Sequence, residues 1–233
     1  MESVSEKNNF LFLLVSLVAL LLAGALVDQF PTALGQHIIQ AVTVITLASA
    51  VIGFRTSKLR IRTSIGFTLS VLVIVILGVL LDAVGLSYLH LLVLLMFYAW
   101  ATWLAARQVL FTGRIDGNKI VGAICIYLLL GMIWGLMYLF IAQIIPNAFN
   151  GLEQAVWYEN FADVAYYSYV TLTTLGYGDI SPVTPLARFL VYMEAIVGVF
   201  YTAILVASLV GVRISTMHPG EESNERKRGS TDE

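Results

Sequence analysis

Apolar residues run along this chain in long blocks that short polar segments separate. An α-helix rises 1.5 Å per residue, so about 20 apolar residues cross a hydrocarbon core of about 30 Å. The blocks that come close to this length lie at about Phe10–Val27, Gln36–Phe54, Ile65–Leu81, Leu86–Leu110, Lys119–Ile145 and Pro185–Val212. The pattern therefore predicts an all-α membrane protein with six transmembrane helices.

A shorter apolar run lies in the long connection between Pro146 and Thr184. It reads FADVAYYSYVTLTTL and is too short to span a membrane, which predicts a re-entrant or buried helix. Glycine-rich sequence, LGYGD, follows it directly. Within lipid, irregular backbone persists only where protein buries it or where it lines a wet cavity. A short helix followed by glycine-rich backbone therefore indicates a water-filled path.

Composition agrees with lipid as the main solvent. The chain is 59% hydrophobic and 12% charged, whereas a soluble domain carries about 25% charged residues. The single cysteine, Cys125, allows no intrachain disulfide, and its apolar neighbours favour a packing role. The sequence has no Cys/His cluster typical of a metal site and no nucleophile–base pair typical of an enzyme. We expect no cofactor, no nucleic-acid partner and no enzymatic activity.

The basic residues indicate how the helices are oriented. With the N-terminus in the cytoplasm, 12 of the 13 lysines and arginines fall on the cytoplasmic side and Arg188 falls outside. The cytoplasmic set is Lys7, Arg55, Lys58, Arg60, Arg62, Arg107, Arg114, Lys119, Arg213, Arg226, Lys227 and Arg228. The positive-inside rule then predicts two cytoplasmic termini. Short external loops favour the plasma membrane of a prokaryote.

The first apolar block has a competing interpretation. Its end, LLAGALV, offers small residues where a signal peptidase would cut. Cleavage would leave five spans with the remaining topology intact. The block is long for a signal sequence, however, and this favours a retained helix.

The glycine-rich stretch suggests a specific chemistry. Because they lack a Cβ, Gly176 and Gly178 can adopt backbone conformations that are closed to other residues. Alternating conformations of that kind turn successive carbonyls to one side, and rings of carbonyls replace the hydration shell of a monovalent cation. Residues 174–178 read T-L-G-Y-G and resemble the T-V-G-Y-G selectivity filter of potassium channels. The likeness extends from about Phe161 to Val212 and includes Thr173, Arg188 and Gly198.

The resemblance implies a pore module of outer helix, pore helix, filter and inner helix. The ion-binding residues would be Thr174, Leu175, Gly176, Tyr177 and Gly178, with Asp179 at the outer mouth. The pore helix, at about 161–173, would aim the negative end of its dipole at a central cavity, and Asn160 is its expected N-cap. One chain supplies one filter loop and the filter needs four, so a homotetramer is implied. K⁺ would be the permeant ion.

Some positions depart from the family pattern. Leu175 stands where valine or isoleucine is usual, which puts conductance and filter stability in question. Val170 stands where some relatives carry a glutamate that bonds the mouth aspartate, so Asp179 would lack that partner. Tyr166 and Tyr167 replace a tryptophan pair, and we expect them to support the filter by packing and hydrogen bonding.

The last apolar block suggests a gate. Thr202, Val206 and Val210 recur at i, i+4 and i+8 below Gly198. By resemblance this face lines the cavity, and Val206 or Val210 would form an apolar constriction that dewets when narrow. Packing of these valines against the fifth helix is the alternative. Gly198 is either a hinge or a site of close helix contact.

Two further features of the last spans remain open. Glu194 is an acidic residue within a span, which marks a functional candidate. Its depth favours bonding behind the filter over contact with ions. Gly131 and Gly135 form a G-x-x-x-G motif, which allows close packing of helices.

Six spans with the pore last resemble voltage-gated channels, but voltage sensing needs charges within the membrane field. The fourth block holds only Arg107, near its cytoplasmic end, so we predict little voltage dependence. The basic segment 55–64 is expected to be a loop that sets topology, with anionic-lipid binding as the alternative.

These observations predict four parts of the chain. Residues 1–111 form a peripheral, non-voltage-sensing membrane domain, residues 112–118 a cytoplasmic linker, residues 119–212 the pore domain and residues 213–233 a disordered polar tail. The tail is too short for a ligand-sensing domain. A gating stimulus would therefore act through the membrane helices, the filter, a lipid or a separate regulator.

Three functions remain in competition. The first is a potassium-selective channel, and the second is a monovalent-cation channel with weaker selectivity because of Leu175. The third is a transporter subunit or a non-conducting sensor. Related transporters place four degenerate loops in one chain, and the single well-kept loop here argues against that class.

Overall fold

The structure, a computed structural model, describes residues 9–27, 41–46, 58–81, 84–110, 117–153 and 155–217. The labelled helices are α1 (Asn9–Val27), α3 (Lys58–Leu81), α4 (Val84–Leu110), α5 (Gly117–Ile144), α6 (Phe161–Leu172) and α7 (Pro185–Met217). The strands are β1 (Phe149–Asn150) and β2 (Ser181–Pro182). Residues 41–46 are also helical.

Each long helix that the structure describes overlaps in sequence with one of the predicted apolar blocks. Three of them are long and apolar enough to cross a membrane, over Tyr88–Val109, Gly117–Ile144 and Pro185–Ser208, within the part of the chain that was described. Phe10–Leu26 and Ile65–Ile74 are shorter apolar segments. The predicted block Gln36–Phe54 lies outside the described residues except for 41–46. A membrane protein is therefore supported, and the number of six spans stays a prediction.

Two predicted boundaries are wrong. α3 begins at Lys58, so residues 58–64 of the basic segment are helical and do not form a loop. Lysine, leucine and arginine favour helices, and neither glycine nor proline interrupts this stretch. α7 continues past the predicted end at Val212 to Met217, so residues 213–217 belong to the helix and not to a polar tail.

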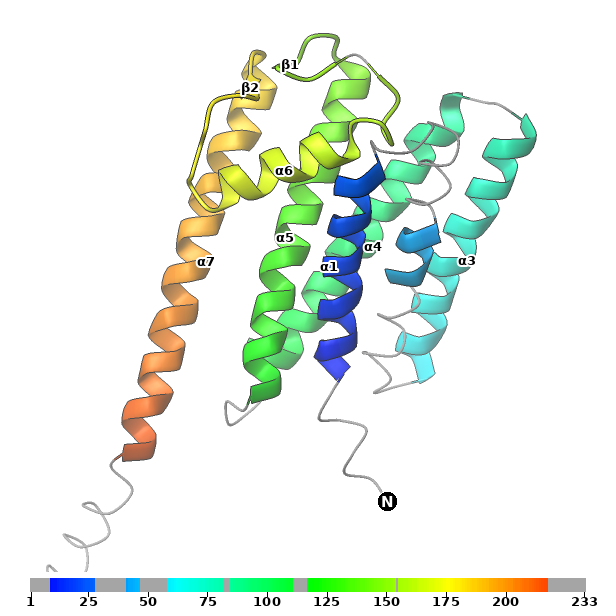
Figure 1. The fold of residues 1–233 in the computed structure, drawn as a ribbon. Coiled ribbons are helices and arrows are strands. Elements are labelled where there is room, and N and C mark those ends of the chain that lie inside the picture. Colours follow the sequence, from blue (N-terminus) through cyan, green and yellow to red (C-terminus); the bar gives the residue numbers. More distant parts are fainter. Residues whose placement is uncertain are drawn as a thin grey trace, which may run out of the picture.

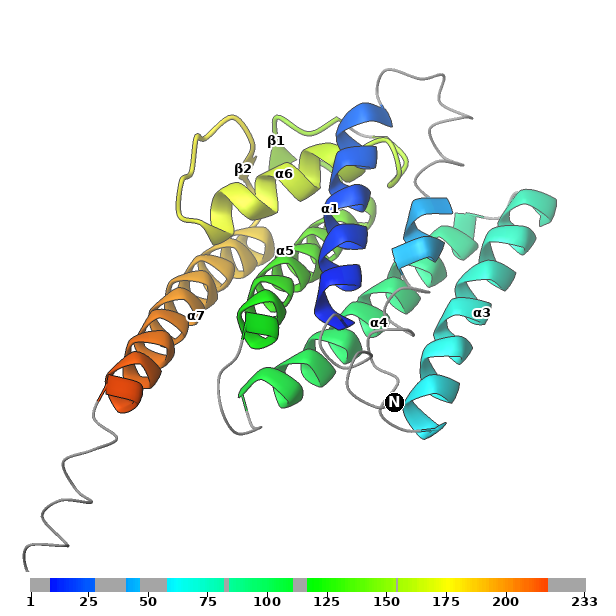
Figure 2. The ribbon, with the colours of Figure 1, turned by 60° about the horizontal axis from the view of Figure 1, so that its bottom comes forward.

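The long helices run roughly parallel, with α7 at the left of Figure 1, α5 and α1 at the centre, α4 behind them against α5, and α3 at the right against α4. The short α6 lies across one end of these helices, together with β1 and β2 (Figure 1). The start of α1 and the last turns of α7 lie at the opposite end, and Figure 2 shows the same arrangement from a second direction. Helix α5 packs against α1, α4, α6 and α7. It therefore joins the peripheral helices to the C-terminal ones, together with a smaller direct contact between α1 and α6.

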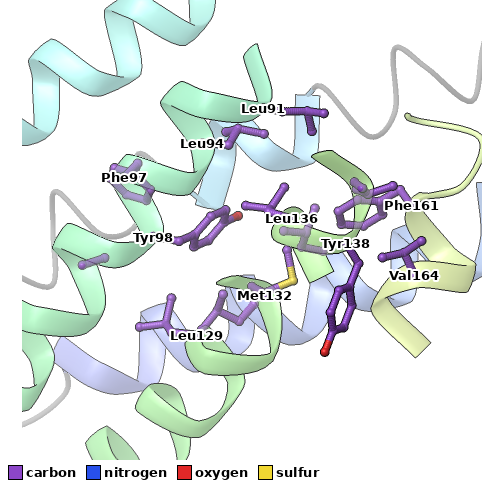
Figure 3. Packing of buried hydrophobic residues seen from close by; sticks show 14 of the residues in the cluster. Leu91, Leu94, Phe97, Tyr98, Leu129, Met132, Leu136, Tyr138, Phe161 and Val164 are labelled. Carbon is purple, nitrogen blue, oxygen red and sulfur yellow. The ribbon is translucent and has the colours of Figure 1, made fainter. Parts of the chain in front are cut away.

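The hydrophobic core lies where α1, α4 and α6 meet α5. Tyr98 of α4 and Leu136 of α5 point toward each other, and Phe161 and Val164 of α6 extend the same cluster (Figure 3). All of these side chains are buried. Lipid tails are as apolar as this core, so close contact between surfaces holds the helices together more than exclusion of water does.

The G-x-x-x-G motif of α5 faces α6. A Cβ at Gly131 would overlap the ring of Tyr169, whose hydroxyl donates a hydrogen bond to the carbonyl of Leu128 at 2.7 Å. A Cβ at Gly135 would lie 3.7 Å from the carbonyl oxygen of Val164, an ordinary contact. Gly131 thus lets the short helix approach α5 closely, which confirms the predicted packing role of the motif.

Gly131→Ala should destabilise the protein by about 1–3 kcal/mol, because the added methyl group displaces the Tyr169 ring and strains its hydrogen bond. Thermal unfolding of the purified protein in detergent measures this. Gly66→Ala is the matched control, because nothing lies within 4 Å of a Cβ at Gly66 in helix α3. Equal melting temperatures for the two variants would contradict the packing role.

Candidate ion-binding site

Helix α6 and the segment after it hold most of the residues singled out in the sequence. Asn160 occupies the expected N-cap position, but its side chain makes no capping hydrogen bond. The amide instead donates to the carbonyl of Glu153 at 2.8 Å. The predicted cap is therefore wrong in its chemistry, because a loop carbonyl competes for the same side chain. Asp163, in the first turn, still places negative charge near the positive end of the helix.

The main chain after α6 folds back onto the end of that helix. The amide of Thr174 donates to the carbonyl of Thr171 at 2.9 Å, and the amide of Leu175 donates to that of Val170 at 2.9 Å. The amide of Gly176 also reaches the carbonyl of Val170, at 3.3 Å. Residues 174–178 are called the filter segment below, and these bonds fix its first three residues by their N–H groups. Within the described residues, no hydrogen bond uses the carbonyls of residues 174–177.

The filter segment alternates between left-handed and ordinary backbone. Thr174, Gly176 and Gly178 have φ values of 60°, 59° and 83°, whereas Leu175 and Tyr177 do not have positive φ. Such alternation turns successive carbonyls toward one side, in contrast to a β-strand, where they alternate. Thr174 is a β-branched residue in a conformation that costs about 1–3 kcal/mol, and strain of this kind gathers at functional sites.

The two glycines of the segment are needed for their backbone and not for space. Nothing lies within 4 Å of a Cβ built at Gly176 or at Gly178. Their positive φ is thus the feature that excludes other residues. In the single chain, all residues from Thr173 to Asp179 are exposed. The side chain of Leu175 is 56% exposed and that of Tyr177 is 68% exposed, so neither finds its packing partners within one chain.

Asp179 is held at the end of the filter segment by two hydrogen bonds. The Tyr166 hydroxyl donates to one carboxylate oxygen at 2.7 Å, and the amide of Ile180 donates to the other at 3.0 Å. The Tyr166 bond is the main reason that the pKa of Asp179 lies below its ordinary value. The same bond raises the pKa of Tyr166 to about 12. Val170 offers no such bond, as the sequence predicts, but Tyr166 supplies the partner from the same helix.

The second tyrosine of the pair faces the protein interior. Tyr167 is buried and packs against Tyr138 and Phe149, with ring centroids 5.4 and 5.7 Å away. The two adjacent tyrosines thus have different roles. Tyr166 bonds the mouth carboxylate, and Tyr167 anchors α6 to α5 and to β1.

A two-stranded ladder pins the chain on the outer side of the filter segment. Phe149 pairs with Pro182, and Asn150 pairs with Ser181. Gly151 follows with φ 75°, and a Cβ there would overlap the carbonyl oxygen of Asp179. The contact of this glycine with Asp179 was not predicted, because Asp179 lies far along the chain. From the sequence alone, Gly151 after Phe149–Asn150 indicates only a turn.

A cleft of about 560 Å³ lies below the filter segment. Thr173 and Thr174 line one side of it, and Gly198, Thr202 and Val206 of α7 line another. The predicted gate residues Thr202 and Val206 therefore line the same cleft as the start of the filter segment. The side chain of Val210 lies outside the described part of the chain.

Tyr127 of α5 also lines the cleft, and the sequence analysis missed it. Its hydroxyl donates to the carbonyl of Leu172 at 3.2 Å, and its ring lies 5.6 Å from that of Tyr201. Its position in a long apolar span gave no signal that it would reach this site.

Gly198 lies in close contact with the end of α6. A Cβ there would overlap the carbonyl oxygen of Leu172, which is backbone and cannot rotate away. The structure thus supports the interpretation of close contact, and a hinge at Gly198 stays a prediction. The Thr202 hydroxyl donates back to the Gly198 carbonyl at 2.9 Å.

Glu194 lies behind α6, away from the cleft. Its side chain is fully buried, and its carboxyl oxygens lie 2.5 Å from the Tyr138 hydroxyl and 2.5 Å from the Ser168 hydroxyl. The preference for bonding behind the filter over ion contact agrees with this position. Tyr138 and Ser168 themselves were missed. A carboxyl group inside a span demands polar partners, but sequence spacing does not identify them.

Comparisons with known proteins bear on the same part of the chain. A family model described as ion channel matches residues 122–213. The inward rectifier potassium channel Kirbac3.1 of Paramagnetospirillum magnetotacticum is 34% identical over 90 residues, which cover 39% of this chain and 28% of that protein. No solved structure matches the chain. Both matches fall on the C-terminal part of the chain, where the sequence predicts the pore module, and they support a likeness to ion channels there.

Tyr166→Phe should raise the pKa of Asp179 toward its ordinary value, because the hydroxyl that stabilises the carboxylate is lost. A carboxylate with a lowered native pKa stabilises the fold above its unfolded pKa and loses that contribution as the pH falls through the native value. The variant should therefore be less stable than wild type at neutral pH, and its acid limb should be shallower, so that the two proteins converge as the pH falls. Melting temperatures across the acidic range measure this. Tyr192→Phe, which removes a hydroxyl without a recorded partner, should leave the limb unchanged.

Gly198→Ala should cost about 1–3 kcal/mol of stability, because α7 must move away from the Leu172 carbonyl. Gly198→Ser should cost at least as much. Thermal unfolding tests both variants. Wild-type stability in both would contradict the contact and favour a hinge.

Proposed function

We propose that the protein is a potassium-selective channel in which four copies of the chain surround one ion path. The carbonyls of the filter segment, with the Thr174 hydroxyl, supply stacked rings of oxygen ligands. The observation that carries the proposal is the alternating backbone, with positive φ at Thr174, Gly176 and Gly178. Dehydrated K⁺ needs oxygen dipoles that replace its water, and carbonyls free of other hydrogen bonds meet that need.

Homotetramer assembly follows from what one chain lacks. A single filter segment gives one wall of carbonyls, and a ring needs several walls. Leu175 and Tyr177 expose most of their side chains, and an adjacent copy would cover them. Helix α7 also presents large apolar side chains, among them Phe189 and Phe200. Some of this surface would face lipid and the rest would pack against neighbouring copies.

The inner end of the filter segment would meet a wet cavity. Helix α6 ends at Leu172, so its partial negative charge, about half an electron, faces the cleft that Thr173 and Thr174 line. The electric field of this helix end would stabilise a cation in the low-dielectric interior of the membrane, where its lost hydration is otherwise costly. Val206 on the opposite wall would supply the apolar constriction.

Membrane orientation and gating also belong to the proposal. Both termini would lie in the cytoplasm of a prokaryotic cell, and the filter would open outward. The start of α1 and the end of α7 at one end of the molecule support this arrangement (Figure 1). The one arginine of α4, Arg107, lies over the Trp103 ring at 4.9 Å near the helix end. The peripheral helices would thus give little voltage dependence.

A weakly selective cation channel is the second candidate. The observation that favours it is the 56% exposure of Leu175, whose γ-branched side chain must find new packing behind the filter segment. A looser filter would admit Na⁺ together with K⁺.

Reversal potentials across a planar bilayer with K⁺ on one side and Na⁺ on the other separate these candidates. The proposal predicts a reversal near the potassium equilibrium value, and Leu175→Val should keep it. A reversal near zero with clear current that Leu175→Val corrects would favour the second candidate. Absence of current in a verified tetramer, across voltages and lipid compositions, would contradict channel function.

A further inference from the structure

The cluster around Glu194 joins the three helices of the C-terminal module. Glu194 comes from α7, Ser168 from α6 and Tyr138 from α5, and the side chains of all three residues are fully buried. The cluster lies outside the cleft and touches no residue of the filter segment. It is therefore separate from the ion path, although Ser168 lies on the helix whose end holds that path.

Hydrogen counting shows what this cluster requires. The Ser168 oxygen lies 2.5 Å from Glu194 and 2.7 Å from the carbonyl oxygen of Gly131. A serine hydroxyl carries one hydrogen, and a carbonyl oxygen carries none. If Ser168 donates to Gly131, the hydrogen in the short contact with Glu194 must come from the carboxyl group.

The other oxygen of Glu194 gives a consistent picture. It lies 2.5 Å from the Tyr138 hydroxyl, which donates to it and has no other recorded acceptor. One carboxyl oxygen thus accepts from Tyr138, while the other donates to Ser168. This is the pattern of a carboxylic acid, whereas a carboxylate accepts at both oxygens.

The surroundings favour the neutral form. The titratable groups that face Glu194 are all tyrosines, Tyr127 and Tyr138 from α5 with Tyr167 and Tyr169 from α6. Within the described residues, no lysine, arginine or histidine forms an ion pair with Glu194. An unpaired carboxylate in such a place would be strongly penalised by its lost hydration.

We propose that Glu194 is a proton-binding site behind the filter, where its neutral carboxylic acid donates to Ser168 and so positions α6 between α5 and α7. The chain of donors runs from Glu194 to Ser168 and on to the Gly131 carbonyl. As a positioning residue, Glu194 acts on the filter segment only through α6. Its effect on ion flux rests on the proposed channel function, whereas its protonation does not.

Loss of the proton would reorganise the cluster. The carboxylate would then accept from Ser168, whose single hydrogen would leave the Gly131 carbonyl without its partner. The link between α6 and α5 would weaken at the turn that precedes the filter segment. Ion flux should therefore fall as pH rises through the titration of this site.

Glu194→Gln separates the neutral acid from the carboxylate. The glutamine amide donates to Ser168 and its carbonyl accepts from Tyr138, so this variant reproduces the proposed protonated form. Infrared spectra of the full-length protein in liposomes at neutral pH should show a protonated carboxyl C=O band that shifts in D₂O. That band should be absent in Glu194→Gln, while the melting temperature is retained.

The same preparations test the effect on conduction. Potassium flux in Glu194→Gln should stay within about twofold of wild type and lose its decline at alkaline pH. Ser168→Ala should lower flux about tenfold, because it removes the hydroxyl that links Glu194 to the Gly131 carbonyl and leaves one buried oxygen of Glu194 without its partner.

Two results would overturn the inference. One is a wild-type infrared spectrum without the protonated band, and the other is a Glu194→Gln protein that loses assembly, as expected if a charged carboxylate were required. A wild-type protein that shows the band but conducts no ions would overturn the channel proposal and leave the proton-binding site intact.

Discussion

Left-handed backbone at every second residue of the filter segment is the constraint on which the other features depend. Thr174, Gly176 and Gly178 hold this conformation, and an isolated loop would not keep it, because a β-branched residue with positive φ is strained. The amides of residues 174–176 donate hydrogen bonds to the carbonyls of Val170 and Thr171 in the last turn of α6. The helix thus supplies the free energy that holds the strained turns, and it leaves the carbonyls available to an ion.

Helix α5 is the platform for this arrangement. Its backbone carbonyls accept hydrogen bonds from Tyr169 and Ser168 of α6 and from Tyr201 of α7, at 2.7, 2.7 and 2.5 Å. Gly131 makes room for the Tyr169 ring, whose hydroxyl forms one of these bonds. Because α5 also packs against α1 and α4, and α1 contacts α6 as well, movements of the peripheral helices would reach α6 and the filter segment through these two contacts. Regulation through the membrane helices would follow that route.

The sequence predicted what local pattern and composition determine. Apolar block lengths predicted the helices, and the two glycines predicted the left-handed backbone at residues 176 and 178, whereas glycine spacing does not encode the positive φ of Thr174. Long-range partners could not be predicted in the same way. The bond from Tyr166 to Asp179 depends on how the filter segment turns back, and the partners of Glu194 come from two other helices. Asn160 had a suitable position for a cap, but its side-chain amide donates to the Glu153 carbonyl and its oxygen accepts no helix N–H.

Anomalous scattering from the assembled protein crystallised with Rb⁺ or Tl⁺ tests the central claim most directly, because these ions substitute for K⁺ and are located individually. The account predicts a row of peaks on the symmetry axis, level with the carbonyl oxygens of residues 174–177. Peaks absent from that axis, in an assembly whose filter segment is well ordered, would contradict it.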